Sequence, residues 1–333
     1  MWHRLFALVA LVSALALLAG CADLPPTSPR NQGEATLLPS AAKGVEKSKV
    51  YEVVERMTVV NRGPGEPSKH NLWVALIQDQ PPYQEVLSRT ISPDDYTLVT
   101  DEYGNQYAEF DFAGMAAGTS IPVEIQTKVR VNDVTFDLAP CEGALPDFFT
   151  DPDLHIEANN PQIIELASQL AEGKANDCEI VRAFYDYIGD NLLYSYNGAS
   201  WGAQAALGEM GADCTEYASL LIALSRAAGI PARYLEGLYH NGGQEEALAR
   251  REHAWVEVYL PGAGWTLLDP TLGRSALTRD AYFAHAAPDH IIVTRGRNPS
   301  TLRGGSYFTH LYWPGQSMEI RIEGFEWNIT PAP

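Results

Sequence analysis

Three side chains of the kinds used in thiol chemistry follow one another along the second half of this chain: Cys214, His253 and Asp269. A cysteine attacks a carbonyl carbon as its thiolate, which a neighbouring histidine generates and stabilises. A carboxylate can hold that histidine in the productive orientation. A lone residue of any of these types is usually just packed or hydrogen-bonded, so a catalytic triad requires elements that bring the three together.

The segment around Cys214 predicts a helix that begins at the cysteine. Asp213 is a good N-cap residue, apolar side chains follow at helical spacing, and Gly229 with Pro231 ends the helix. The free amide hydrogens and positive dipole end of a helix N-terminus favour an anionic thiolate. The charge of Asp213 opposes this effect, so activation of the thiol also needs a histidine.

His253 and Asp269 lie on two strands that a tight turn would join into a hairpin. If residues 261–263 form a three-residue loop, Leu260 pairs with Gly264, and the histidine and aspartate share one face of the hairpin, offset by one pair. A two- or four-residue loop would put them on opposite faces unless a bulge intervened. The turn is rich in glycine, which favours the three-residue form.

These segments resemble the transglutaminase-like superfamily over roughly residues 190–271. The similarity is carried by the sequences GADC at 211–214, AGIPAR at 228–233, HAWVEV at 253–258 and GWTLLDPT at 264–271. The resemblance implies a papain-like α+β core with Cys214 as nucleophile, His253 as base and acid, and Asp269 as the residue that orients the histidine. Members of the superfamily include protein crosslinkers, peptide and amide hydrolases, and proteins that have lost activity.

The expected reaction is therefore acyl transfer from a peptide amide through a thioester on Cys214. Water as the acceptor makes the protein a peptidase or amidase, and a lysine amine makes it a transglutaminase. Hydrolysis is favoured because water is abundant and no amine site is evident. The alternative is a non-catalytic envelope lipoprotein that keeps the fold and holds a peptide in its cleft.

The surroundings of the thiol are less defined by the sequence. The Cys214 backbone N–H is one natural oxyanion donor. Trp201 and Gln204 are the nearest upstream side chains that could supply a second donor. Tyr194 and Tyr196 either line the cleft or pack beneath it.

No cofactor and no metal ion are expected. His285 and His290 could suggest a metal, but no Cys or Glu completes a recognised ligand spacing. Nucleic acid is excluded as a partner by charge, because 23 basic residues against 42 acidic ones give a net charge of −19.

The first residues predict export and a lipid anchor. Residues 1–20 combine a short cationic start with an apolar run too short to span a bilayer, as in a signal peptide. The run closes with LAGC at 18–21, which resembles the lipobox of bacterial lipoproteins and implies acylation of Cys21. Residues 21–48 are rich in proline and polar residues and predict a flexible tether. The protein would face the periplasm or exterior, with envelope peptides or proteins as substrates.

The remainder divides by hydrophobic period. Residues 49–137 hold short β-branched and aromatic runs and predict a small antiparallel β-sandwich domain. Residues 138–333 are expected to form the transglutaminase-like catalytic domain, with helices at 161–171, 177–191 and 214–229 followed by strands. Helices first and strands later give an α+β fold class.

Four cysteines remain to be divided among these roles. Lipidation would consume Cys21 and catalysis would require Cys214 to stay free. Cys141 and Cys178 are then an even pair in an oxidising compartment, which predicts a disulfide between them. Such a bridge would fasten the start of the catalytic domain to its own second helix.

Overall fold

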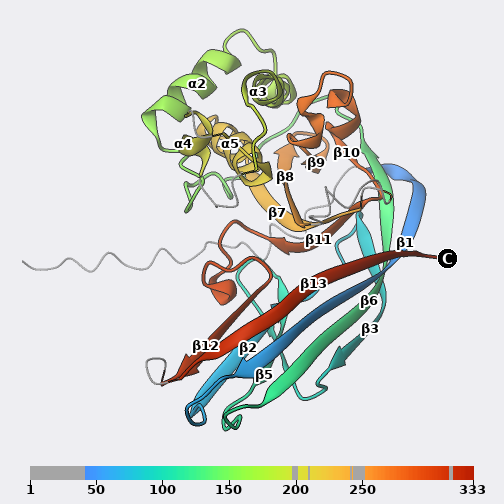
Figure 1. Cartoon of the computed structure of the whole chain (residues 1–333). Coiled ribbons are helices and arrows are strands. Elements are labelled where there is room, and N and C mark those ends of the chain that lie inside the picture. The colour runs from blue at the N-terminus through green and yellow to red at the C-terminus, as the bar shows by residue number, and fades with distance from the viewer. Residues whose placement is uncertain (1–41, 197–201, 209–210, 241, 243–251, 315–317) are drawn as a thin grey trace, which may run out of the picture. The chain divides into compact units, whose positions relative to one another are not determined.

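The computed structural model of the chain describes residues 42–196, 202–208, 211–240, 242, 252–314 and 318–333 (Figure 1). The expected signal peptide at 1–20, the expected lipidation site Cys21 and most of the expected tether lie outside the described residues. None of the helices in the described part of the chain is both long and apolar enough to cross a membrane.

Antiparallel strands dominate the described part of the chain, and the α-helices found there fall between residues 161 and 227. The strands are β1 (Ala42–Asn61), β2 (Lys69–Ala75), β3 (Gln84–Ser92), β4 (Thr97–Thr100), β5 (Gln106–Asp111), β6 (Ser120–Phe136), β7 (Ala232–Tyr239), β8 (Glu252–Leu260), β9 (Gly264–Leu268), β10 (His285–Ala286), β11 (His290–Arg295), β12 (Phe308–Trp313) and β13 (Ile320–Ala332). The helices are α2 (Pro161–Ala171), α3 (Asp177–Asn191), α4 (Ala203–Ala206) and α5 (Cys214–Ala227), with short 3₁₀ turns η2 (Leu272–Arg274), η3 (Arg279–Tyr282) and η4 (Ser300–Leu302). This mixture confirms the α+β fold class.

Two sheets of the chain enclose a core of their own. One has the order β10-β6-β1-β13, with β3 also paired to β6, and the other has the order β12-β2-β5-β4. Buried side chains of both sheets pack together, among them Val59, Leu72, Phe110 and Val123. The two sheets therefore form the antiparallel sandwich that the short apolar runs predict.

The C-terminal strands depart from the expected domain boundaries. β13 pairs with β1 along most of its length, and β12 pairs with β2. The end of the expected 138–333 catalytic domain thus completes both sheets of the sandwich. At the other limit, β1 begins at Ala42, inside the expected 21–48 tether. Pairing partners so distant in sequence leave no local periodic signal, which is why the pattern of residues does not reveal them.

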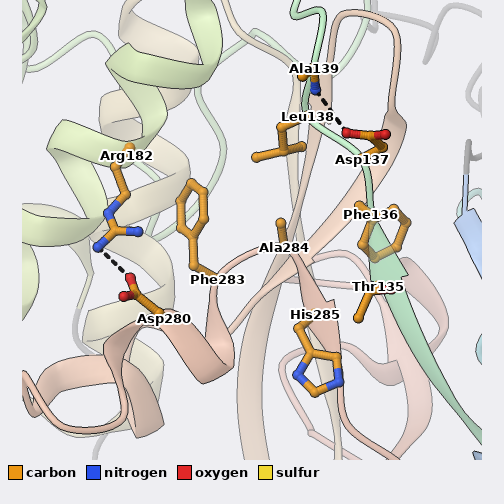
Figure 2. A pocket seen from close by; sticks show the side chains of 10 residues that line it. All are labelled: Thr135, Phe136, Asp137, Leu138, Ala139, Arg182, Asp280, Phe283, Ala284 and His285. Carbon is orange, nitrogen blue, oxygen red and sulfur yellow. Dashed lines mark hydrogen bonds and ion pairs between the residues drawn. The ribbon is translucent and has the colours of Figure 1, made fainter. Parts of the chain in front are cut away.

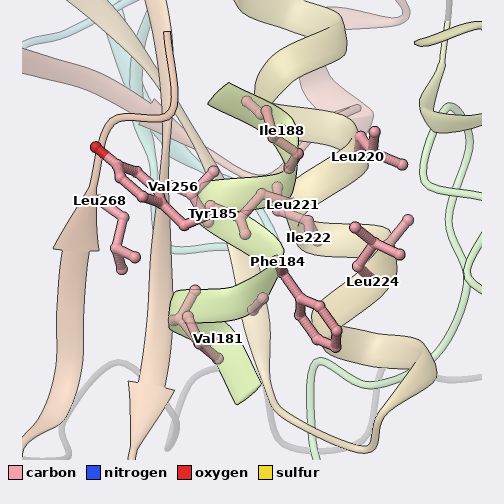
Figure 3. Packing of buried hydrophobic residues seen from close by; sticks show 14 of the residues in the cluster. Val181, Phe184, Tyr185, Ile188, Leu220, Leu221, Ile222, Leu224, Val256 and Leu268 are labelled. Atoms are coloured by element: carbon pink, nitrogen blue, oxygen red, sulfur yellow. The ribbon is translucent and has the colours of Figure 1, made fainter. Parts of the chain in front are cut away.

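The third sheet, with the order β11-β7-β8-β9, carries the candidate site. Helices α2, α3 and α5 pack on one face around a core that includes Phe184, Ile188, Leu221 and Val256 (Figure 3). On the other face, Trp255 and other buried residues contact Val134 and Phe136 at the end of β6. The sheet is therefore covered by helices on one side and by the sandwich on the other, which excludes water from both faces.

Candidate active site

Cys214 is the first residue of the most deeply buried helix. The Asp213 carboxylate accepts a hydrogen bond from the Thr215 N–H at 3.0 Å, and the Asp213 N–H donates to Glu216 Oε2 at 3.0 Å. This reciprocal capping box fixes the first turn of α5. Cys214 itself is partly exposed and is not disulfide-bonded, so the fixed helix end presents a free thiol that a reagent can reach.

The β8–β9 hairpin has the register that places His253 and Asp269 on one face. Leu260 pairs with Gly264 across a three-residue loop, as the sequence predicts. Gly262 and Gly264 adopt the left-handed conformation, with φ of 79° and 74°. An L-residue with a Cβ rarely adopts these angles, so the glycines are what the turn requires.

Asp269 is wholly buried and accepts four hydrogen bonds. Its Oδ2 is 2.7 Å from Nε2 of His253, while Oδ1 accepts the backbone N–H groups of Thr271 and Leu272, both at 2.9 Å. The fourth bond, to Oδ2 at 3.0 Å, comes from Nε2 of His290. Burial would raise the pKa of the Asp269 carboxyl, but the charges and hydrogen bonds of the two histidines hold it well below its usual range.

His253 connects this carboxylate to the thiol. Burial lowers the pKa of His253, but the charge and hydrogen bond of Asp269 and a hydrogen bond with Cys214 outweigh it and raise the pKa to about 9. Since Nε2 is engaged by Asp269, Nδ1 is the ring nitrogen left to face the Cys214 sulfur. The structure thus brings the three sequence-predicted residues together in the order thiol, imidazole, carboxylate.

His290 is the site residue that sequence reasoning missed. It begins β11, two strands from His253 in the sheet, and its ring lies 5.8 Å from the His253 ring. Its Nδ1 is 2.7 Å from Oδ1 of Asp289. His285, with which the sequence grouped it, lies elsewhere and contacts Asp133 at 2.8 Å. The adjacent Asp289-His290 pair was the available signal, but nothing in its spacing links it to Asp269.

His253, Asp269 and His290 offer the ligand types of a metal site, with their donor atoms within 4.8 Å of one another. The geometry instead suits hydrogen bonds, because both ring nitrogens approach the same carboxylate oxygen at 2.7 and 3.0 Å. Ligands about 2.0–2.1 Å from a tetrahedral zinc would lie about 3.3 Å apart. The three residues therefore form a hydrogen-bonded series in which two imidazoles share one carboxylate oxygen.

The segment before α5 runs alongside the nucleophile. The Ser195 N–H donates to the Ala212 carbonyl at 2.9 Å, which brings residues 193–196 next to the turn that leads into Cys214. Tyr194 and Tyr196 in this segment are 44% and 51% exposed, so they line the surface instead of packing beneath it. Trp201 lies outside the described residues. Gln204 is exposed, and its backbone N–H donates to Glu157 Oε2 at 3.2 Å.

Cys141 and Cys178 form a disulfide, with their Cα atoms 6.1 Å apart. Cys178 is the second residue of α3, and Cys141 follows the end of β6. The bridge joins the expected pair and leaves the Cys214 thiol free.

A separate hollow of about 740 Å³ lies between β6, β10 and α3 (Figure 2). Its wall includes Leu138 and Phe283, and Arg182 donates to Asp280 at its rim over 2.7 Å. The Arg182 guanidinium also stacks 5.0 Å from the Phe283 ring. None of the three triad residues lines this hollow.

Comparisons with known proteins agree with this geometry. The family model of the transglutaminase-like superfamily matches residues 164–270. Protein YebA of Bacillus subtilis strain 168 is 29% identical over 165 residues, and a protein-glutamine gamma-glutamyltransferase of Pseudomonas aeruginosa PAO1 is 29% identical over 124 residues. These matches cover 44% and 34% of this chain but only 21% and 18% of the two relatives.

A solved structure of a candidate cysteine protease from Cytophaga hutchinsonii superposes with a TM-score of 0.63 at 16% identity. It covers 87% of this chain and 93% of its own, so the shared fold extends over the sandwich as well as the helices. The segment that the family model matches contains Cys214, His253 and Asp269. Residues 164–270 are therefore similar to a transglutaminase-like core, and the thiol, imidazole and carboxylate described above lie within it.

Proposed function

We propose that this protein is a thiol enzyme that transfers the acyl group of a peptide amide through a thioester on Cys214. His253 takes the thiol proton, and the sulfur attacks the amide carbonyl to give a tetrahedral intermediate. The His253 imidazolium then gives its proton to the departing amine, which leaves the thioester. The observation that carries this proposal is the hydrogen-bonded series Cys214, His253 and buried Asp269.

Hydrolysis is the favoured second half-reaction. His253 would remove a proton from water, which attacks the thioester and releases the acid with the free thiol. The names of similar proteins support both outcomes, since one is a gamma-glutamyltransferase and another a candidate cysteine protease. Water is the acceptor present at high concentration, so a peptidase or amidase is the simpler assignment.

The proposed setting is the cell envelope, where Cys21 would carry the lipid and secreted proteins or wall peptides would be the substrates. This part rests on the apolar leader and the LAGC sequence at 18–21. The net charge of −19 argues against a nucleic-acid partner.

A peptide-library digest tests the activity directly. Wild type and Cys214→Ala would be incubated with the library in water and with an added fluorescent primary amine. New peptide ends in the wild-type sample alone indicate hydrolysis, and amine incorporation indicates transamidation. Products of equal yield in both proteins would refute the thiol mechanism. Binding without products in either protein would favour the peptide-binding alternative.

A further inference from the structure

The His290 ring lies between two carboxylates at the far side of the candidate triad. Nδ1 is 2.7 Å from Asp289 Oδ1, and Nε2 is 3.0 Å from Asp269 Oδ2. A neutral imidazole has one N–H and can donate to only one of these partners. An ionised carboxylate only accepts hydrogen bonds, so both contacts are made only when both nitrogens carry protons.

Both carboxylates are in the ionised form that this geometry needs. Asp269 is fully buried, its Oδ1 accepts two backbone N–H groups, and its Oδ2 lies 2.7 and 3.0 Å from the ring nitrogens of two histidines. Asp289 is partly buried, which opposes ionisation, but its contact with His290 and the nearby Lys49 charge lower its pKa. Removal of one His290 proton would turn a ring lone pair toward one of these carboxylates and leave both anions without the positive charge between them, at a free-energy cost.

We propose that His290 is a positioning residue of the thiol site: an imidazole held by Asp289 that stays doubly protonated at neutral pH, fixes Asp269 Oδ2 toward His253 and supplies the carboxylate with a second positive partner. The role is distinct from that of His253, because both ring nitrogens of His290 are engaged by Asp289 and Asp269. His290 acts by holding Asp269 and by its charge, 5.8 Å from the His253 ring.

The surroundings of His290 support a fixed ring. Rings of Trp255 and Tyr239 lie 5.0 and 5.2 Å from it, and its side chain is 2% exposed. Burial opposes the charge, but the hydrogen bonds that His290 donates to both carboxylates, together with their negative charges, outweigh it and raise the pKa of His290 to about 9. The titratable or charged groups that face His290 or its carboxylate partners include His253, Asp269, Asp289, Tyr51, Tyr185, Tyr239, Tyr282 and Lys49.

A positive charge at this place has a defined effect on the catalytic pair. The positive charge of His290 partly neutralises the negative charge of the Asp269 carboxylate. Asp269 therefore raises the pKa of His253 less than it would without His290. His253 must accept a proton from the thiol and later give it to the leaving amine. A carboxylate whose charge is partly neutralised keeps the pKa of His253 moderate, which allows both the uptake and the release of the proton. Without the His290 charge, the Cys214 thiol and the His253 imidazolium would lose their protons at higher pH.

The first test is a measurement on the wild-type full chain. Side-chain ¹⁵N spectra of histidine-labelled protein, assigned with His290→Gln, report how many protons each ring carries. We expect both His290 nitrogens to be protonated from pH 5 to about 8, where an ordinary histidine with a pKa near 6.5 has lost one proton. A singly protonated ring at neutral pH would overturn the proposal.

The second test uses His290→Gln, whose amide can still donate to Asp269 but carries no charge. The rate of Cys214 alkylation by iodoacetamide would be followed against pH. We expect the profile to move to higher pH by up to about 1–2 units, the effect of a unit charge on the His253 ring at 5.8 Å, because His253 passes part of that effect to the thiol with which it is hydrogen-bonded. Turnover should fall with little change in KM.

His285→Gln is the matched control, because His285 is also paired with an aspartate but lies outside the site. Its alkylation profile should equal that of wild type. A wild-type profile in His290→Gln would contradict the proposal, and if that variant does not fold, the wild-type spectra, assigned instead with His290→Asn, decide alone. The proposal rests on the proposed triad, but neither readout needs a substrate, so a failure here is distinguishable from failure of the peptide digest.

Discussion

At the scale of single residues, the site is a series of groups in which each fixes the next. Cys214 is placed by its helix, His253 by the hairpin and Asp269 by two backbone amides and two imidazoles. The roles of the first three follow from the sequence because each stands in a local motif. The role of His290 does not, because it depends on β11 returning beside β7, a pairing that no local spacing encodes.

Substitutions in the triad should have graded effects. Cys214→Ala and His253→Ala each remove a group that forms or breaks bonds, so turnover should fall to background. Asp269→Asn disturbs the orientation and charge of the base but leaves it present, so we expect a loss of about 10²- to 10⁴-fold in kcat. Single-turnover rates on a cleaved peptide measure the three variants. Activity that survives in Cys214→Ala would be inconsistent with the assignment.

Stability should depend on pH through the same residues. His253 and His290 have pKa values raised from 6.5 to about 9, so they bind protons more tightly in the folded state than in the unfolded chain. Their contribution to stability is complete below pH 6.5 and is lost as the pH rises through about 9. The pKa of Asp269 is lowered, so its contribution is present above pH 4 and is lost as the pH falls further.

Thermal melts at constant ionic strength check this dependence. The midpoint should fall between pH 6.5 and 9.5, and His290→Gln should show a smaller fall because one of the two raised groups is gone. A wild-type midpoint that rises over this interval would contradict the assigned protonation states.

At the scale of elements, periodicity and capping predict the parts that hold the site. Helices α2 and α3 have the predicted bounds, and Asn160 and Asn176 cap their first turns. The hairpin register also follows from its loop length. Strand β3 lies on an edge of its sheet and has mostly exposed or half-exposed side chains, so its pattern lacks the clear alternation by which strands are recognised.

The Cys141–Cys178 bridge links the approach to the helical region with α3, across a sequence separation of 37. The chain-entropy relation gives about 4 kcal/mol of stabilisation for a loop of this length. The double variant Cys141→Ser/Cys178→Ser should lose up to that amount in denaturant titration. Cys214→Ser is the matched control and should retain the wild-type midpoint. A non-reducing peptide map that finds both thiols alkylated, or a bridge to Cys214, would refute the pairing.

At the scale of the whole molecule, the proposed lipid anchor lies outside the described part of the chain. Cys21 precedes the first described strand by 21 residues, and a stretch of that length would be enough to separate a lipid on Cys21 from the folded part. Extraction of the native protein should require detergent, and Cys21→Ser should be found in the soluble fraction without an acyl mass at that residue. A wild-type protein that is soluble without detergent and carries no acyl group would count against the lipid anchor.

The sandwich and the β11-β7-β8-β9 sheet, which carries the candidate site, are joined by buried polar contacts. Glu257 on β8 accepts hydrogen bonds from Arg233 at 2.6 Å and from Arg295 at 3.3 Å. The backbone of Arg295 is in turn held by both side-chain amide atoms of Asn105, each at 2.8 Å. Gln84 makes the same paired contact with the backbone of Ile292, at 2.9 and 2.8 Å. Strand β11 is therefore supported by the sandwich, and β11 carries His290.

Residues 138–333 expressed alone should consequently fail to form a stable enzyme. This fragment would lack Gln84 and Asn105, so the backbone groups of β11 that they bind would lose their hydrogen bonds. It would also lack β1 and β2, so β13 and β12 would have unpaired edges open to water or to association with another copy. The matched control begins at residue 40 and keeps every described strand. Circular dichroism melts and Cys214 alkylation should show a cooperative, reactive protein for the control and neither property for the shorter chain. A folded and active 138–333 fragment would show that the transglutaminase-like core is independent of the sandwich.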